Sequence, residues 1–403
     1  MNVGDASLLK VGWLPLWAAS MAAQGNFVYT NNDQFPPFGP NSISAFSAGE
    51  DGVLTEISGS PFSTGGWGGG GGYFASNRVL AINGFLYASN ADTNDVSAFA
   101  IDGKTGSLTP VPGSPFPTAG TSYVGFSLAA TPDGRFLYAT QDLSTSIRIF
   151  QRDAKAGILT PVGDLVYSGG LGANSMKVSP DGTWLALVLT RTGPHGSVAM
   201  FRIDSETGRL TSVPGSPFRV RGPGGPDGIA SGLDINCAGE LLFIAEGAFG
   251  PALVDVLSVD SETLTLTPIE DSPFLPEVGE DSVVAFLSLD DSLLFVSNVI
   301  TNDVTVFTVA FGGSLSVVPG SPFRARGGTV PSGMATDPSG VFLYLTEAGQ
   351  GGGKPPSAVD VFNIGSDGVL TEVPEAPFST HVGGAPTFSL TAYPGKTCPS
   401  KSN

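Results

Sequence analysis

Residues 108–116 read Leu-Thr-Pro-Val-Pro-Gly-Ser-Pro-Phe, and nearly the same nine letters stand at 54–62 and 210–218. Weaker copies of the Pro-Phe end follow at Pro273-Phe274, Pro322-Phe323 and Pro377-Phe378. Val166-Tyr167 occupies the place where one more copy is due, so the copies number seven and are 49 to 56 residues apart. A period near 50 residues, built from short strand-like runs and turn residues, is typical of the blades of a β-propeller.

Each repeat contains four strand-like runs. In the last repeat these runs are 331–336, 342–346, 358–362 and 369–373. The turn sequences Asp-Pro-Ser-Gly at 337–340 and Asp-Gly at 367–368 separate the first pair and the last pair of runs. The sequence therefore predicts an all-β protein, a seven-bladed β-propeller of four-stranded antiparallel blades. We name the strands A to D from the central axis outward.

The two ends of the chain are expected to share one blade. The first repeat begins at residue 25 with a strand of type B, and no strand A precedes it. Residues 388–395 resemble 126–134, which contain the strand A of blade three. We therefore predict that residues 385–394 pair with 26–31, so that the C-terminal strand completes blade one. Closure of the ring removes the open sheet edges of a linear array.

The chain divides into an N-terminal segment at 1–24, the propeller at 25–395 and a C-terminal tail at 396–403. The first segment has an apolar core followed by small residues, as signal peptides do, but it lacks a positively charged start. A signal-peptide-like segment and a loose N-terminal arm both remain open. No apolar run is long enough to span a bilayer.

The composition argues against several classes of partner. With 36 acidic and 18 basic residues, the net charge is −18, which repels phosphate backbones and disfavours nucleic acid. The same charge suits a soluble protein that does not self-associate, so we expect a monomer. The five glycines at 68–72 lack the Lys-Ser/Thr of a phosphate-binding loop, and two His without a Cys cluster do not make metal-ligand spacing. We expect neither a cofactor nor a metal.

Three motifs together are similar to a known family. They are Phe-Leu-Tyr-Ala-Ser-Asn at 85–90, the Pro-Asp-Gly turns at 132–134 and 180–182, and the nine-letter repeat ends. Over about residues 25–395 the chain resembles the lactonase family of seven-bladed propellers. That family includes 6-phosphogluconolactonase and carboxymuconate-cyclising enzymes and extends into secreted YVTN-type propellers. The resemblance implies hydrolysis of a sugar-type lactone at the loop face of the central channel. The alternative is a non-catalytic extracytoplasmic propeller that binds a glycan, a peptide or a surface partner.

The catalytic pattern of that family is not matched. Active members resemble one another in carrying Pro-Arg-His on an inner strand and Asn-Glu just after the next strand. Blade seven has Ser332-Gly333 and then Glu347 at the Asn position, and blade five has Ser231-Gly232 and then Glu246. As carboxylates at the end of strand B, Glu347 and Glu246 are candidates for a general base or for contacts to sugar hydroxyls. The competing interpretation is a pair of solvated acids at loop edges.

Basic residues and both histidines are expected on the loop face. Arg219 and Arg221 in blade four and Arg324 and Arg326 in blade six directly follow Phe of the repeat end. Guanidinium groups suit carboxylates and phosphates, so these four are candidates for substrate binding, unless each only pairs with a neighbouring acid. His381, and less so His195, is a candidate general base near neutral pH or an incidental loop residue.

The only two cysteines fall in corresponding turns on the opposite face. Cys237 lies in the A-to-B turn of blade five, and Cys398 follows the corresponding turn of blade one by four residues. These two turns lie nearly across the ring from each other, ~17 Å apart in a small propeller. Four extended residues reach ~13 Å, and a disulfide adds about 5.5 Å between its Cα atoms, so the tail is long enough to span this distance. A bond between Cys237 and Cys398 is therefore feasible; two free thiols are the alternative. The bond needs an oxidising compartment, which favours a periplasmic or secreted protein over a cytoplasmic one.

Overall fold

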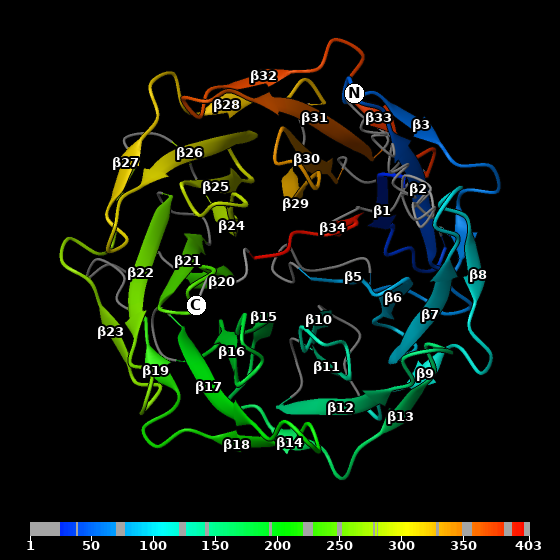
Figure 1. The fold of residues 1–403 in the computed structure, drawn as a ribbon, viewed down its shortest axis with the longest axis horizontal. Coiled ribbons are helices and arrows are strands. Elements are labelled where there is room, and N and C mark those ends of the chain that lie inside the picture. Colours follow the sequence, from blue (N-terminus) through cyan, green and yellow to red (C-terminus); the bar gives the residue numbers. More distant parts are fainter. Residues whose placement is uncertain are drawn as a thin grey trace, which may run out of the picture.

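The computed structural model describes residues 25–37, 39–69, 77–120, 126–141, 145–192, 196–220, 229–247, 252–276, 279, 281–327, 330–348, 357–382 and 389–398. These residues form 34 strands and no helix, and the strands gather into seven antiparallel sheets around a central axis (Figure 1). The predicted all-β, seven-bladed propeller is confirmed. No helix long and apolar enough to cross a membrane occurs in this part of the chain.

Each of blades one to four has four strands in order from the central axis outward and a short fifth strand that pairs with strand C. Blade one holds β34 (Ser389–Tyr393), β1 (Phe27–Asn31), β2 (Ser42–Ala48), β3 (Leu54–Glu56) and β4 (Phe62–Ser63). Blade two holds β5 (Val79–Ile82), β6 (Phe85–Asn90), β7 (Asp95–Ile101), β8 (Leu108–Pro110) and β9 (Phe116–Pro117). Blade three holds β10 (Phe126–Ala130), β11 (Phe136–Gln141), β12 (Ser146–Arg152), β13 (Leu159–Pro161) and β14 (Val166–Tyr167). Blade four holds β15 (Ala173–Val178), β16 (Trp184–Leu189), β17 (Ser197–Ile203), β18 (Leu210–Ser212) and β19 (Phe218–Arg219).

The remaining three blades follow the same order. Blade five holds β20 (Ile229–Ile235), β21 (Leu241–Gly247), β22 (Leu253–Val259) and β23 (Leu266–Pro268). Blade six holds β24 (Ser282–Leu287), β25 (Leu293–Asn298), β26 (Asp303–Val309), β27 (Leu315–Val317) and β28 (Phe323–Arg324). Blade seven holds β29 (Pro331–Thr336), β30 (Phe342–Glu347), β31 (Ala358–Ile364), β32 (Leu370–Glu372) and β33 (Phe378–Ser379).

The repeat ends form a short fifth strand that the four-strand pattern did not predict. After strand D the chain turns back, and in six blades the repeat end pairs with the start of strand C, as in β9 on β7. In blade five Phe274 makes only a single bridge, to Val254. The Ser of the motif also binds strand C: the Ser114 hydroxyl accepts a hydrogen bond from the backbone N–H of Ala98 at 2.9 Å. The equivalent serines Ser60, Ser216, Ser272 and Ser321 make the same bond in their blades. Where the motif is complete, its Ser and its Phe therefore both attach the end of the repeat to strand C of the same blade.

The hydrophobic core lies between the blades and not inside any one of them. Seven clusters of buried side chains each combine two neighbouring sheets, one cluster for every boundary in the ring. The strand-B tyrosines cross these boundaries: the Tyr29 hydroxyl donates to the carbonyl of Gly106 in blade two at 2.8 Å. Tyr87 and Tyr138 repeat this bond to Gly157 and Gly208. These aromatic residues thus pack blade against blade.

The ring is closed by the predicted pairing of the two chain ends. β34 is the innermost strand of blade one and pairs antiparallel with β1, from Phe27 opposite Tyr393 to Asn31 opposite Ser389. Figure 1 shows the red C-terminal strand beside the dark blue N-terminal one. Buried Leu390 and Ala392 of β34 join the core between blades seven and one. Residues 385–388 of the expected pairing lie outside the described residues.

The tail beyond β34 crosses the face that carries the A-to-B turns. Cys398 is joined to Cys237 of blade five by a disulfide, with their Cα atoms 5.3 Å apart. Lys396, in the tail between β34 and Cys398, contacts blade six. Its Nζ donates to the carbonyl of Leu287 at 3.3 Å and lies 3.4 Å from Asp291 Oδ1. The tail is thus attached to blades five and six, away from the blade that it completes.

Candidate functional site

One repeated position separates the blades chemically: the sixth residue of strand B. In blade two it is Asn90, whose side-chain amide donates to Ser97 Oγ at 2.7 Å and to Asp95 Oδ1 at 2.6 Å on strand C. The same position makes equivalent contacts in two more blades, from Asn32 to Ser42 and Ser44 and from Asn298 to Asp303 and Thr305. In these three blades a neutral amide and a hydroxyl satisfy each other at the loop-face end of the sheet.

Blades five and seven carry acids at both of these places. In blade five Glu246 and Asp255, and in blade seven Glu347 and Asp360, replace the Asn of strand B and the Ser or Thr of strand C, which lies two residues beyond the directly paired position. All four side chains belong to residues that are at most 1% exposed. We call these the blade-five pair and the blade-seven pair. The expectation that Glu246 and Glu347 are solvated loop-edge acids does not describe them, because both are buried.

Burial makes each pair hold a proton at neutral pH. Burial and the neighbouring Asp255, which shares a hydrogen bond with it, raise the pKa of Glu246 to about 10. Burial and the nearby carboxyl groups of Glu347 and Glu372 raise the pKa of Asp360 to about 9. Two carboxyl groups this close cannot both ionise without water around them, so one stays protonated.

The blade-seven pair lies against the loop that contains Arg326. A Cβ atom placed on Gly327 would lie 3.0 Å from Glu347 Oε2 and 3.1 Å from Asp360 Oδ2, so a larger residue here would need the two carboxyl groups to move by a few tenths of an ångström. Next to it, Arg326 Nε lies 2.7 Å from Glu372 Oε2, and the Arg326 backbone N–H donates to Glu372 Oε1 at 2.9 Å. Arg326, Glu372, Asp360 and Glu347 therefore form one cluster across the boundary of blades six and seven.

The blade-five pair has different neighbours. Ser272, the motif serine of that blade, donates from Oγ to Asp255 Oδ1 at 2.8 Å. Blade seven has Ala376 at the position of this serine and uses Glu372 instead. Arg221 precedes the blade-five pair as Arg326 precedes the blade-seven pair, but Arg221 lies outside the described residues. Of the two pairs, only the blade-seven pair has a described arginine beside it.

The remaining sequence candidates lie elsewhere. His381 Nε2 lies 3.7 Å from Glu56 Oε2 of blade one, and its side chain is 66% exposed. Glu56 is the third residue of its strand D, as Glu372 is of its own, so His381 and Arg326 occupy equivalent places at successive blade boundaries. Arg219 and Arg324 are exposed on β19 and β28. His195 lies outside the described residues.

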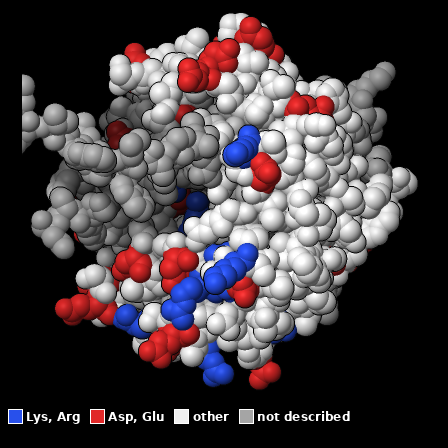
Figure 2. Space-filling view, turned by 45° about the vertical axis from the view of Figure 1, so that its right-hand side comes forward, with Lys and Arg blue, Asp and Glu red and all other residues white. Residues whose placement is uncertain are grey.

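Charged side chains of both signs occur side by side on the surface. Figure 2 shows acidic and basic groups intermingled along the lower edge of that view, while much of the right-hand side carries no charge. Arg326 with Glu372 is one such pair of neighbours. In the part of the chain that the structure describes, no three His, Cys, Asp or Glu side chains are arranged to hold a metal ion.

Sequence reasoning missed one buried ion pair. Arg78 before β5 pairs through Nη1 with Asp33 after β1, and these side chains are 1% and 0% exposed. Gly69 donates its backbone N–H to Asp33 Oδ1 at 3.2 Å and helps to cover the pair. The repeat alignment that puts Glu347 at the Asn position of the lactonase-like Asn-Glu motif also puts Asn32-Asp33 on that motif, so a signal was available. The pair joins blade one to blade two.

Comparison with known proteins finds a family that is similar to part of the chain. A family model described as lactonase, 7-bladed beta-propeller matches residues 40–173 and 122–224. No curated protein sequence matches the chain.

Solved structures extend the likeness over most of the chain. A "putative 6-phosphogluconolactonase" from Bacteroides fragilis is 19% identical with a TM-score of 0.71, over 93% of this chain and 99% of that one. One of the same description from Bacteroides uniformis is 16% identical, TM-score 0.71, over 92% and 99%. The periplasmic gluconolactonase PpgL of Pseudomonas aeruginosa is 17% identical, TM-score 0.69, over 92% and 99%. At these identities the structures show a shared fold, that of a seven-bladed β-propeller, and the family model makes residues 40–224 of this chain similar to the lactonase family.

Proposed function

We propose that the protein hydrolyses a sugar-type lactone and that the blade-seven pair provides the acid and the base. The observation that supports this assignment is the buried Glu347–Asp360 pair, which keeps one proton and has Arg326 beside it. The family and the gluconolactonase-like structures support the substrate class. Glu246, whose partner Asp255 is already bonded by Ser272, is the weaker candidate.

The chemistry follows from having one ionised and one protonated carboxyl group. Glu347, as the ionised partner, accepts a proton from water while the water oxygen attacks the lactone carbonyl carbon. Asp360, kept protonated by its raised pKa, donates to the ring oxygen as the C–O bond breaks. The product is an open-chain hydroxy acid, and water has been added across the ester bond. At the end of the reaction Glu347 carries the proton and Asp360 is ionised. Transfer of this proton from Glu347 back to Asp360 through solvent restores the starting state.

The arginines add attraction for an anionic substrate. Arg324 is exposed and Arg326 keeps part of its side chain exposed while it pairs with Glu372. A phosphate or carboxylate on the lactone would be drawn to this edge of the loop face. Their effect should therefore depend on substrate charge.

The test is hydrolysis of a lactone panel that includes 6-phosphogluconolactone and uncharged gluconolactone. We expect Glu347→Gln and Asp360→Asn each to lower kcat by about 100-fold or more. Glu246→Gln makes the same chemical change in blade five and should keep activity. Loss of activity in Glu246→Gln, with retention in Glu347→Gln, would move the site to blade five.

A second comparison isolates the arginines. The double variant Arg324→Ala and Arg326→Ala should raise KM for the phosphorylated lactone and leave KM for gluconolactone unchanged. Equal KM values for the double variant and the wild type on both lactones would remove the arginines from the site. If the folded wild-type protein turns over no lactone at all, the non-catalytic binding propeller replaces the proposal.

We further propose an extracytoplasmic location. A disulfide between Cys237 and Cys398 persists only in an oxidising compartment. One of the similar structures is a periplasmic gluconolactonase. The signal-peptide-like residues 1–24 lie outside the described residues; N-terminal sequencing of secreted protein tests whether they are removed.

A further inference from the structure

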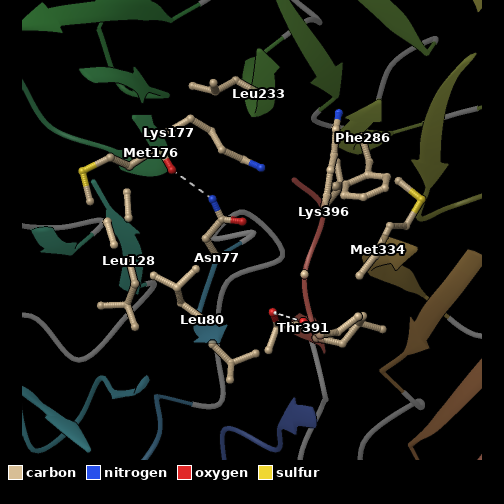
Figure 3. Close-up of a pocket in the computed structure, with 18 of the residues that line it drawn as sticks. Asn77, Leu80, Leu128, Met176, Lys177, Leu233, Phe286, Met334, Thr391 and Lys396 are labelled. Atoms are coloured by element: carbon tan, nitrogen blue, oxygen red, sulfur yellow. Dashed lines mark hydrogen bonds between the residues drawn. The ribbon is translucent and has the colours of Figure 1, made fainter. Parts of the chain in front are cut away.

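A cavity of about 210 Å³ lies at the centre of the ring, toward the face crossed by the tail. It is lined by residues of all seven innermost strands and by Gly395 and Lys396 of the tail. Figure 3 shows these residues converging on one space from different blades. The cavity is distinct from the blade-seven pair, which stands at the loop-face end of strand B.

Most of the cavity wall is apolar. Leu128, Met176, Leu233 and Met334 come from equivalent places on four inner strands, each opposite the fourth residue of its strand B. Phe286 adds an aromatic side chain from blade six. Such walls favour a ligand with an apolar body.

The charged residues that line the cavity are both lysines, Lys177 of β15 and Lys396 of the tail. This is unexpected in a chain with twice as many acidic as basic residues. The acids that pair with them, Asp234 at 3.1 Å and Asp291 at 3.4 Å, are not part of the lining. An ammonium group has three donors, so each lysine can serve its aspartate and also an anion in the cavity.

Two segments outside the innermost strands also border the cavity: Asn77, which precedes β5, and the C-terminal tail. Asn77 accepts the Leu128 N–H of blade three at 2.8 Å and donates from Nδ2 to the Met176 carbonyl of blade four at 3.0 Å. Figure 3 shows its side chain reaching between these strands, with the tail on the other side of the cavity. The disulfide at Cys398 holds the tail, and with it Lys396, in this position.

We propose that this central cavity binds a small monocarboxylate, whose carboxylate meets Lys177 and Lys396 while its apolar body contacts the Leu and Met wall. Neither half of the cavity alone favours this class: the wall suits any apolar molecule, and the lysines suit any anion. Together they select a molecule with one anionic end and an apolar remainder. This binding site is additional to the proposed lactone hydrolysis.

The test compares hexanoate with hexan-1-ol by titration calorimetry and thermal shift on the oxidised protein. Hexanoate should bind and raise Tm, and hexan-1-ol, which has the same body without the charge, should bind much more weakly. Lys177→Met and Lys396→Met should each weaken hexanoate binding about tenfold or more. The control is Lys104→Met, which removes an exposed lysine in the β7–β8 hairpin and should bind hexanoate as the wild type does.

Tm without ligand shows whether each variant is folded, and Lys396→Gln replaces Lys396→Met if that variant is not. Absence of hexanoate binding to the wild type, or equal binding by wild type and folded lysine variants, would overturn the proposal. Lactone hydrolysis by Lys177→Met should stay at the wild-type rate, so failure of this site and failure of the proposed function are distinguishable.

Discussion

At the scale of single residues, one position in the repeat carries an amide in some blades and an acid in others. Asn90 and Ser97 satisfy each other without a net charge, whereas Glu246 and Asp255 at the same places can do so only with a shared proton. Burying a carboxylate without such a proton costs several kcal/mol, so folding and proton binding are linked. The acid pairs therefore bind a proton on folding that Asn90 and Ser97 themselves cannot bind, while Asp95 beside them also has a pKa raised by burial.

The sign of this dependence follows from the direction of the shift. The pKa of Glu246 rises from 4.5 to about 10 on folding, so the folded state holds a proton that the unfolded chain releases. The stabilisation is full below pH 4.5 and is lost as pH rises toward 10, by at most about 1.4 kcal/mol per pH unit. We expect Glu246→Gln to flatten the fall of Tm between pH 5 and 9. Glu206→Gln, at an exposed site, is the control, and parallel curves for both variants would contradict the linkage.

At the scale of elements, the strand that closes the ring matters more than its five residues suggest. β34 completes blade one on one side and packs against blades seven and two on its faces. Its removal would leave the edge of β1 unpaired and would open the core that contains Val28 of blade one and Tyr344 of blade seven. A single short strand thus supports three blades.

A chain that ends at Gly384 should therefore lose at least about 10 °C in Tm. A chain that ends at Cys398 lacks only residues beyond the described tail and serves as the control. Because the shorter chain also lacks the disulfide, Cys398→Ser measures that part separately. A Tm within two or so degrees of the full chain after removal of 385–403 would show that β34 is dispensable.

The disulfide has its own prediction. It closes a loop with a sequence separation of 161 residues, and in the chain-entropy account such a loop stabilises on the order of 5 kcal/mol. Intact-mass analysis of protein treated with an alkylating agent should show no adduct before reduction and two after it. Adducts on both cysteines without reductant would mean that the bond does not form in solution.

At the scale of the whole molecule, stability is divided among seven boundaries between blades. Each boundary has its own cluster of buried side chains, and the cluster between blades seven and one makes the ring continuous. The chain has 36 acidic and only 18 basic residues, so its net charge of −18 produces a net repulsion within this ring. The closed ring must therefore hold together against its own charge.

Salt should relieve that repulsion. At pH 7, where the net charge is −18, raising NaCl from about 0.02 M to 0.3 M shortens the screening distance severalfold and should raise Tm. Near pH 4.3, the isoelectric point, the same addition should change Tm little. Equal effects of NaCl at the two pH values would show that the net charge does not control stability.

The sequence alone was sufficient for the repeat, the blade count and the closure. These follow from local chemistry: the Ser-Pro-Phe ends, the Asp-Gly turns and the alternating strands recur at a fixed spacing, and a missing strand A at the start matches an extra one at the end. The short fifth strand escaped prediction because its two residues are too few to show a periodicity.

The candidate site depended on tertiary structure. From the sequence, Glu347, Arg326 and His381 are all plausible loop-face residues, but the sequence does not show which side chains surround them. The folded ring buries Glu347 beside Asp360 on the neighbouring strand of blade seven, pairs Arg326 with Glu372 and leaves His381 beside Glu56 of blade one. Burial and proximity decide whether a carboxyl group keeps its proton; the pairing of β30 with β31 brings the two carboxyl groups together, and the packing of the blades buries them.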